Sequence, residues 1–225
     1  MNKILIIGAS KGIGAAIAAL LQPDLQVLSI SRSQPEQEVG EHYQCDVLTD
    51  PLPSISDALA GLVYCPGSIH LKPFSALKTD DFRYDFELNV LGAVRCLKQY
   101  HSNLRAADSA SVVLFSSVAA QTGFSYHSSI AASKAAVEGL TRALAAEWAP
   151  NIRVNAIAPS LTKTGLSERL LSDEHKIKAA ADKHALKRVG EPNDIAQMAA
   201  FLLSANTTWI TGQVFHVDGG MSVIK

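Results

Sequence analysis

Short apolar runs alternate with longer segments of helical periodicity from one end of the chain to the other. Several of the short runs are continuously apolar, which is typical of strands in a parallel sheet that helices cover on both faces. Repeated strand–helix units of this kind predict an α/β fold, a doubly wound parallel sheet of about seven strands. The predicted strands are 3–7, 26–30, 42–45, 61–65, 111–116, 152–157 and 213–217, and the predicted helices are 12–21, 79–105, 128–148, 166–184 and 193–203.

The length of the chain and the absence of a recognisable linker favour a single domain. The 225 residues show no low-complexity tract, internal repeat or obvious linker, and a domain of this class runs to about 200 residues or somewhat more. We therefore expect residues 1–225 to form one domain. The polar segment 33–41 is predicted to be a surface loop, and the stretch from Asp46 to Val63 has room for only a short helix.

Composition excludes several classes of protein. With 20 Lys and Arg against 21 Asp and Glu, the chain offers no electrostatic footprint for nucleic acid or an anionic membrane. No segment approaches the roughly 18 apolar residues of a membrane span. Cys45, Cys65 and Cys96 are odd in number and lack CxxC spacing, and the histidines are scattered. These features predict buried thiols in a reducing compartment, a cytoplasmic protein, and no metal site.

A glycine-rich turn, GASKGIG at residues 8–14, follows the first predicted strand and opens the first predicted helix. Doubly wound sheets bind ligands at the carboxyl ends of their strands, where glycines let the backbone approach a pyrophosphate and the helix N-terminus supplies free N–H groups. The alternative is a merely tight strand-to-helix connection. Its place at the first such turn favours cofactor binding, with Gly8, Ser10, Lys11, Gly12, Ile13 and Gly14 as candidate residues.

The end of the second predicted strand bears on the choice of cofactor. An acid at this position commonly binds the adenosine ribose of NAD, whereas an arginine accommodates the 2′-phosphate of NADP. The sequence here has Arg32 and no acid, and Lys11 is a second candidate for the same phosphate. Unless both are simply solvated surface cations, these residues favour NADP(H) over NAD(H).

Further motifs in the same order resemble those of the short-chain dehydrogenase/reductase family over nearly the whole chain. The glycine turn is similar to the family's TGxxxGxG, and Gly67 is what remains of its NNAG. The other matching positions are Asp46 in CDVLTD, Asn89 in ELNVLGA, the pair Ser116 and Ser117, Lys134 in AASKAAVEGL, NAIAP at 155–159, Thr164, RVGEP at 188–192, and the segments 209–212 and 217–220.

The resemblance implies a Rossmann-type fold and hydride transfer between a nicotinamide and a small carbonyl or alcohol. It implies that Asp46 lies beside the adenine, and that Gly67, Pro159 and Thr164 line the cofactor site. It also implies catalytic roles for Asn89, Ser117 and Lys134, with Lys134 binding the ribose as well. A substrate lid is expected at 161–187, and the alanine-rich helix 128–148 is expected to pair between subunits in a homodimer or homotetramer.

One departure from the family pattern concerns the chemistry itself. Ile130 stands four residues before Lys134, where the family has its catalytic tyrosine, and isoleucine has no proton to transfer. His127 is predicted to share a helical stripe with Ile130 and Lys134, and imidazole suits general acid–base work near neutral pH. Our hypothesis is that His127, with Ser117, handles the proton. The alternative is that His127 caps the helix or hydrogen-bonds only locally.

Three functions remain open from the sequence. The first is an NADP(H)-dependent oxidoreductase with a non-standard proton donor, which the retained Asn89, Ser117 and Lys134 favour. The second is an NADP(H)-binding sensor or partner subunit without dehydrogenase activity, which Ile130 favours. The third is an isomerisation or dehydration on the same scaffold, for which the sequence has no positive feature.

Overall fold

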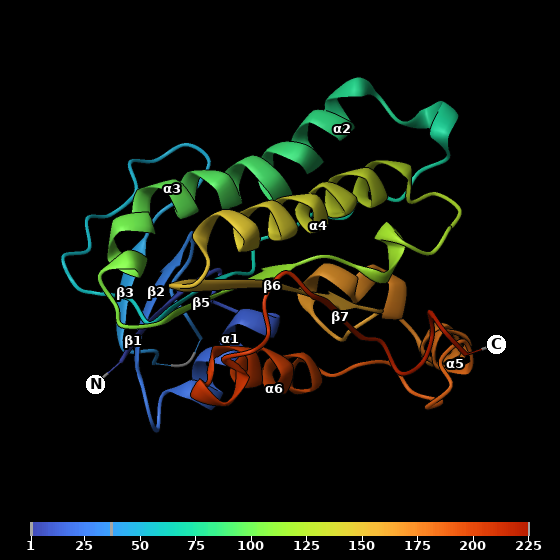
Figure 1. Ribbon diagram of the computed structural model, residues 1–225. Helices are drawn as coiled ribbons and strands as arrows, with labels where there is room; N and C mark the ends of the chain where they lie inside the picture. The colour runs from blue at the N-terminus through green and yellow to red at the C-terminus, as the bar shows by residue number, and fades with distance from the viewer. Residues whose placement is uncertain (1, 37, 225) are drawn as a thin grey trace.

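A parallel sheet of seven strands, in the order β3-β2-β1-β4-β5-β6-β7, forms the centre of the protein (Figure 1). The computed structural model describes residues 2–36 and 38–224. The strands are β1 (Lys3–Ile7), β2 (Gln26–Ser31), β3 (Glu41–Gln44), β4 (Gly61–Tyr64), β5 (Ala110–Phe115), β6 (Ile152–Pro159) and β7 (Val214–Val217). The α-helices are α1 (Gly12–Leu21), α2 (Thr79–Phe86), α3 (Gly92–Arg105), α4 (Ser128–Trp148), α5 (Glu174–Asp182) and α6 (Pro192–Leu203).

Helices cover both faces of the sheet, as the continuously apolar strands predict. One core lies between the sheet and α3 and α4, and a second lies between the sheet and α1 and α6 (Figure 1). Every residue of β4 and β5 is buried. Strands buried on both faces have no polar side to turn to solvent, which explains the absence of alternation in their sequences. The prediction of a doubly wound α/β fold is confirmed.

The strand order places the ligand-binding edge of the sheet. β1 pairs in parallel with β2 on one side and β4 on the other, with Ile7 opposite both Ile30 and Tyr64. The chain therefore reverses its winding direction at β1, and the connections that leave β1 and β4 diverge to opposite faces. Segments that follow the strands meet at this carboxyl edge, where the candidate residues were predicted to lie.

Two predicted helices are not regular α-helices throughout. The segment 79–105 contains α2 and α3 joined by a π-helical turn, Glu87–Leu91, which carries Asn89. The segment 166–184 contains a 3₁₀ helix, Gly165–Leu171, followed by α5. Asp173 separates these two because its carboxylate accepts a hydrogen bond from the backbone N–H of Lys176 at 2.9 Å and so begins a new helix.

The connection between Asp46 and Val63, predicted to have room for only a short helix, contains no helix in the structure. A turn over residues 47–50 is followed by chain without regular structure up to β4. Pro51 and Pro53 lack backbone N–H donors, and α3 satisfies the free carbonyls instead. The Tyr100 hydroxyl donates to Pro53 O at 2.9 Å, and Asn103 Nδ2 donates to Ile55 O at 2.7 Å.

Candidate active site

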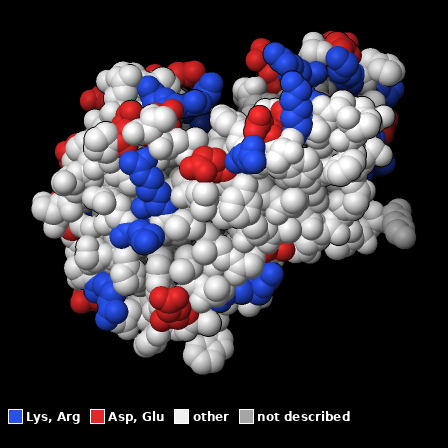
Figure 2. Space-filling model, turned by 90° about the horizontal axis from the view of Figure 1, so that it is seen from above, with Lys and Arg blue, Asp and Glu red and all other residues white. Residues whose placement is uncertain are grey.

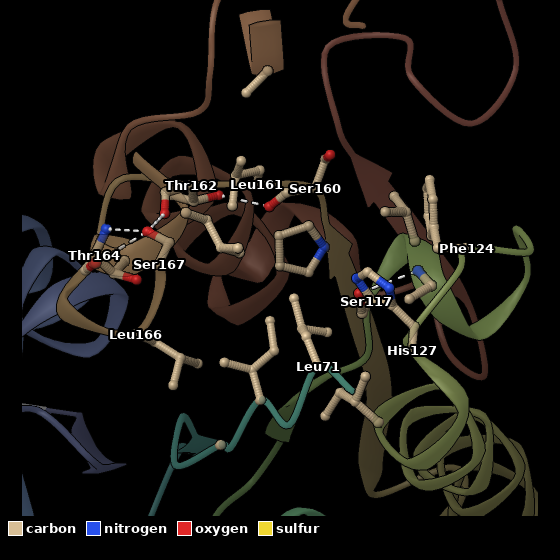
Figure 3. A pocket seen from close by; sticks show the side chains of 18 of the residues that line it. Leu71, Ser117, Phe124, His127, Ser160, Leu161, Thr162, Thr164, Leu166 and Ser167 are labelled. Atoms are coloured by element: carbon tan, nitrogen blue, oxygen red, sulfur yellow. Dashed lines mark hydrogen bonds between the residues drawn. The ribbon is translucent and has the colours of Figure 1, made fainter. Parts of the chain in front are cut away.

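A cavity of about 740 Å³ opens at the carboxyl edge of the sheet. Its walls come from the segments after β4, β5 and β6, from the first turns of α4, and from residues 160–184 (Figure 3). In Figure 3, Ser117, Phe124 and His127 lie on one side, and Thr162, Thr164 and Ser167 lie on the other. Of the predicted site residues, the cavity brings together Ile13, Gly67, Ser117, His127, Lys134, Pro159 and Thr164.

The glycine turn has the backbone geometry of an anion site. Gly8 and Gly12 take left-handed conformations with φ of 86° and 61°. A Cβ on Gly14 would collide with the carbonyl oxygen of Gly8, so the turn closes only without a side chain there. Lys11 at the N-cap of α1 makes no side-chain capping bond. The first N–H groups of α1 therefore remain available for a phosphate, with the positive end of the helix dipole behind them.

The segment after β6 lies against this turn. A Cβ on Gly12 would be 3.4 Å from Thr164 Cγ2, and one on Gly165 would be 3.9 Å from Lys11 Nζ. Thr164 thus lies beside the glycine turn and also lines the cavity. This contact joins the two ends of the predicted cofactor site although they are more than 150 residues apart in sequence.

Arg32 and Asp46 lie at the ends of β2 and β3 and do not line the cavity. The Arg32 side chain is exposed, and its backbone carbonyl accepts a hydrogen bond from Gln44 Nε2 at 3.0 Å. The Asp46 carboxylate accepts from the backbone N–H of Leu48 at 3.0 Å, which stabilises the turn after β3. The structure therefore places both on the β2–β3 side of the glycine turn, away from the cavity itself.

Lys134 is a buried cation in the wall of the cavity. Its Nζ donates to the carbonyl oxygen of Phe115 at 2.9 Å. Burial lowers the pKa of its ammonium from the ordinary 10.5 to about 8, although the nearby Cys65 and Asp85 oppose this change. A lysine in this range exchanges its proton close to neutral pH, which is the range that acid–base chemistry uses.

The two serines after β5 have different environments. Ser116 is buried, and its hydroxyl donates to Glu138 Oε1 at 2.8 Å, which ties β5 to α4. Ser117 is the N-cap of a short 3₁₀ helix, Val118–Ala120, and its Oγ accepts from the N–H of Ala119 at 3.2 Å. The Ser117 hydroxyl proton is thus uncommitted among these contacts, and Ser117 is the better placed to bind a ligand oxygen.

Ile130 lies in the cavity wall and is 4% exposed. It is on the first turn of α4, one turn before Lys134, so the position four residues before the lysine does face the cavity. No ionisable side chain replaces it there. Any proton transfer at this wall must come from a neighbour.

His127 is the neighbour with a free ring nitrogen. It occupies the N-cap position of α4 but makes no side-chain capping bond. Its Nδ1 lies 2.7 Å from the carbonyl oxygen of Ser125, so Nδ1 carries a proton and Nε2 is left without a partner in this contact. Tyr126 has a φ of 70°, is 57% exposed and does not line the cavity. The His127 side chain thus does not cap α4, but it does make the local hydrogen bond that the alternative interpretation expects.

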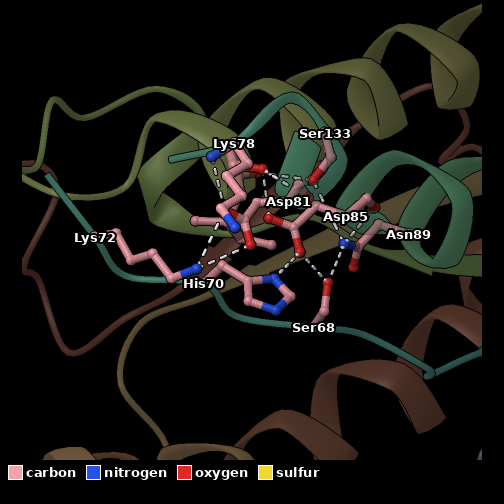
Figure 4. Close-up of polar contacts among 10 residues, drawn as sticks. Ser68, His70, Lys72, Lys78, Asp81, Asp85, Asn89 and Ser133 are labelled. Carbon is pink, nitrogen blue, oxygen red and sulfur yellow. Dashed lines mark hydrogen bonds and ion pairs between the residues drawn. The ribbon is translucent and has the colours of Figure 1, made fainter. Parts of the chain in front are cut away.

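Asn89 belongs to a buried polar network under the N-terminal turns of α4 (Figure 4). Its Nδ2 donates to Asp85 O at 2.8 Å and to Ser68 Oγ at 3.0 Å, while its Oδ1 is buried without a hydrogen-bond partner. A Cβ on Gly67 would lie 3.3 Å from this oxygen and 3.6 Å from Lys134 Nζ. A side chain at position 67 would therefore press against the Asn89 oxygen and lie close to the Lys134 ammonium.

Asp85 is the centre of the same network and was not predicted from the sequence. Its carboxylate is fully buried and accepts from Ser68 Oγ at 2.6 Å, from Ser129 Oγ at 2.6 Å and from His70 Nδ1 at 2.7 Å. These contacts join the segment after β4 to α2 and to the start of α4. The available signal was an acid four residues before Asn89, on the helix face that packs inward.

A second histidine, His184, was also missed. It is 3% exposed, and its Nε2 lies 2.9 Å from Ser160 Oγ while its Nδ1 lies 2.8 Å from the carbonyl oxygen of Ala180. This pair attaches the segment after β6 to the end of α5. The sequence shows no signal for the contact because 24 residues separate the two side chains.

Other classes of site find no support in the described part of the chain. No group of His, Cys, Asp or Glu there could hold a metal ion, and none of its helices is long and apolar enough to cross a membrane. Cys45 and Cys96 are buried, Cys65 is half-buried, and all three are free thiols. Burial raises the pKa of Cys65 and of Cys96 to about 12, so neither is poised to react as a thiolate.

Comparison with known proteins places the chain among reductases and dehydrogenases. A family model described as enoyl-(acyl carrier protein) reductase matches residues 8–222. A tropinone reductase homologue of Arabidopsis thaliana is 34% identical over 241 residues, covering 97% of this chain and 78% of the homologue. The ligand-free structure of aldohexose dehydrogenase from Thermoplasma acidophilum has a TM-score of 0.90 at 28% identity, covering 100% of this chain and 95% of the other. The structure of ElxO with NADP bound has a TM-score of 0.85 at 28% identity, covering 98% of each chain.

Proposed function

Because the chain belongs to the short-chain dehydrogenase/reductase family of oxidoreductases, we propose that it transfers a hydride between NADP(H) and a small carbonyl or alcohol substrate. The observation that carries this proposal is a shared cavity. Ser117, His127 and Lys134 line the same space as Ile13 of the glycine turn and Thr164, which lies against that turn.

The residues present fit a dinucleotide. The free N–H groups at the start of α1 suit the pyrophosphate, and the Lys134 ammonium, which lines the cavity beside Gly67, suits the hydroxyls of a ribose. Gly8, Ser10, Lys11, Gly12, Ile13, Gly14, Arg32, Asp46, Gly67, Lys134, Pro159 and Thr164 would hold the cofactor. When bound, the nicotinamide supplies or accepts the hydride.

NADP(H) is the form that the end of β2 supports. Arg32 is exposed directly after β2, Lys11 is the N-cap of α1, and neither Arg32 nor the next residue, Ser33, is an acid that would repel a 2′-phosphate. ElxO, a relative of the same fold, was solved with NADP. Arg32 and Lys11 would together bind the additional phosphate.

In the proposed reduction, the carbonyl carbon gains the hydride and its oxygen gains a proton. Ser117 Oγ–H donates a hydrogen bond to that oxygen, and His127 Nε2–H, in the charged ring, transfers the proton. The Ser125 carbonyl holds the ring through Nδ1 and so directs Nε2. Lys134 holds positive charge at the floor of the cavity, which stabilises the oxygen as electron density grows on it. In the oxidation direction the same groups act in reverse.

The proposal is tested by NADPH oxidation with a panel of ketones, diketones and quinones. Wild type is compared with His127→Ala and with His175→Ala, a surface histidine outside the cavity. We expect turnover by wild type and a loss of about 10²–10⁴-fold in His127→Ala, the usual contribution of a general acid, with His175→Ala unchanged. Full activity of His127→Ala would remove the role of His127.

A second function is favoured by one observation, the buried Ile130. An NADP(H)-binding protein without dehydrogenase activity would bind NADPH and leave it unchanged. The variant Ile130→Tyr separates the two functions. A silent wild type beside an active Ile130→Tyr would mean a complete scaffold that lacks only its proton donor, and would favour the binding protein.

We also propose that residues 1–225 act as one catalytic domain, that 161–187 forms its substrate lid, and that the protein is a cytoplasmic homodimer or homotetramer. The free thiols suit a reducing compartment. On the outer face of α4, Ala132, Ala135 and Gly139 are exposed and small enough for another helix to approach closely. Figure 2, which views the side of α2, α3 and α4, shows both signs of charge interspersed around large uncharged areas. A monomeric mass by light scattering at micromolar concentration would contradict the assembly.

A further inference from the structure

The lid contributes charge of one sign to the cavity. Lys176, Ala179, Ala180 and Lys183 line it, and their spacing of three, four and seven residues puts them on one face of α5 and its end. Arg169, from the preceding 3₁₀ helix, lines the cavity as well. The alanines leave space between the two lysines, so the cationic groups border an open part of the wall rather than a filled one.

The acidic residues of the same segment lie elsewhere. Residues 161–187 include Glu168, Asp173, Glu174 and Asp182, and none of these lines the cavity. Among the described residues, no Asp or Glu from any other element lines it either, while Lys134 adds a cation at the floor. A cleft that is lined by cations and has walls of low dielectric constant concentrates anions and speeds their association.

Of the three cations that residues 161–187 contribute to the cavity, Lys176 already has side-chain partners among the described residues, whereas Arg169 and Lys183 have none. Lys176 Nζ lies 3.4 Å from Asp173 Oδ2 and donates to Ser172 Oγ at 2.8 Å. The guanidinium of Arg169 and the ammonium of Lys183 form no ion pair or side-chain hydrogen bond with the residues that the structure describes. Both are exposed at the cavity rim, and a guanidinium fork suits carboxylate and phosphate oxygens.

The cofactor's own phosphates have another place to bind. The glycine turn is contacted by the beginning of the lid, at Thr164 and Gly165. The end of α5 instead contacts other segments through His184. A Cβ on Gly219, after β7, would lie 3.4 Å from the His184 ring, and His184 Nε2 is hydrogen-bonded to Ser160 Oγ, after β6. Lys183 therefore belongs to the part of the lid that faces the substrate rather than the glycine turn.

We propose that the substrate is an anionic carbonyl compound, in which a carboxylate or phosphate binds Arg169 and Lys183 while the carbonyl faces Ser117 and His127. Apolar side chains line much of the same cavity, with Leu71, Phe124, Leu161 and Leu170 among them, so it would accept a short hydrocarbon stretch joining the two groups of the substrate. This inference rests on the proposed function and specifies its substrate class. The anionic group only binds: no bond to it forms or breaks, and the reaction at the carbonyl is the hydride and proton transfer described above.

The test compares matched charged and neutral compounds. Reduction by NADPH is measured for levulinate and a longer oxo-acid, each beside its own methyl ester, and for dihydroxyacetone phosphate beside dihydroxyacetone. We expect kcat/KM to be at least about tenfold higher for the anion of the preferred pair, the effect of one charge-assisted hydrogen bond. The oxo-acid and phosphate pairs distinguish the two anions.

Variants test whether Arg169 and Lys183 are the residues that favour the anionic substrate. Arg169→Gln and Lys183→Gln should each raise KM for the anionic substrate about tenfold, with little change for its neutral partner and none in KM for NADPH. Lys178→Gln is the matched control, because Lys178 is an exposed lysine of the same helix that does not line the cavity. Equal use of anion and neutral compound, or a change confined to KM for NADPH, would overturn the inference.

Binding separates this inference from the proposed function. If none of these compounds is reduced, calorimetric titration of the protein–NADPH complex with each pair still decides the matter. Anion binding that Lys183→Gln weakens would support the anionic site while the proposed hydride transfer fails. Equal or absent binding of charged and neutral compounds would count against the site.

Discussion

Lys134 shows most directly how burial changes the chemistry of a single residue. Its pKa falls from 10.5 to about 8 because the ammonium is removed from water. Below pH 8 the ammonium is charged in both the folded and the unfolded chain, and the folded state bears the full cost of burying it. Between pH 8 and 10.5 the unfolded chain binds more protons than the folded one, so the free energy of unfolding rises with pH from this residue.

The variant Lys134→Met tests this sign. The stability of wild type relative to Lys134→Met should shift by about 2–3 kcal/mol in favour of wild type between pH 7 and pH 10.5, as a pKa difference of this size requires. Urea unfolding at several pH values measures it. The same series on Lys178→Met, at an exposed position, should show no such trend. A difference that is constant with pH would contradict the lowered pKa.

Asp85 makes a second prediction at the scale of one residue. Asp85→Ala removes the acceptor of three short hydrogen bonds. It leaves the Ser68 hydroxyl proton without its acceptor and the Ser129 hydroxyl with only the longer contact to Asp81 O at 3.3 Å. We expect a loss of about 3–5 kcal/mol in the free energy of unfolding. Asp80→Ala is the control, since Asp80 is 80% exposed and only pairs with Arg83, and it should change stability by less than about 1 kcal/mol. Similar effects of the two variants would show that the network adds little.

At the scale of elements, the turn between β1 and α1 depends on the absence of a side chain. A Cβ on Gly14 would collide with Gly8 O, whereas a Cβ on the exposed Gly139 of α4 meets nothing within 4 Å. Gly14→Ala should therefore displace the start of α1 and weaken NADPH binding by at least about tenfold, the loss of one charge-assisted hydrogen bond. Gly139→Ala, which leaves the glycine turn unaltered, should leave NADPH binding unchanged. Fluorescence titration with NADPH measures both variants.

The segment proposed as the lid illustrates why elements differ from their sequence pattern. The segment 166–184 has the periodicity of one amphipathic helix, yet it divides at Ser172–Asp173 because Asp173 caps α5. The segment 79–105 keeps its continuity but widens to a π-helical turn at Asn89. Side-chain hydrogen bonds with the backbone decide such breaks, and apolar spacing does not reveal them.

At the scale of the whole molecule, cofactor binding should stabilise the fold in proportion to affinity. NADPH should raise the thermal midpoint of wild type more than NADH does, because Lys11 belongs to the glycine turn and Arg32 follows β2, whose Ile30 carbonyl accepts a hydrogen bond from the N–H of Gly8 in that turn. Arg32→Ala should remove most of the additional NADPH effect and leave the NADH effect unchanged, while Arg83→Ala, at an exposed surface pair, should change neither. Equal midpoints with both cofactors in wild type would contradict the preference for NADP(H).

The sequence by itself determined the sheet, the helices on both faces and the edge at which the site lies. These depend on apolar periodicity and on glycine, which act locally and are visible in the chain. Family motifs pointed to Ser117 and Lys134, and helical spacing pointed to His127; the structure places all three in the wall of one cavity. Tertiary structure alone decided the contacts between distant segments. It joined Ser68 and Ser129 to Asp85, attached Ser160 to His184, and turned Lys176 and Lys183 toward the cavity while their acidic neighbours face away. Such pairs form because buried polar groups must find partners wherever the packed chain brings them, and no local pattern specifies that partner.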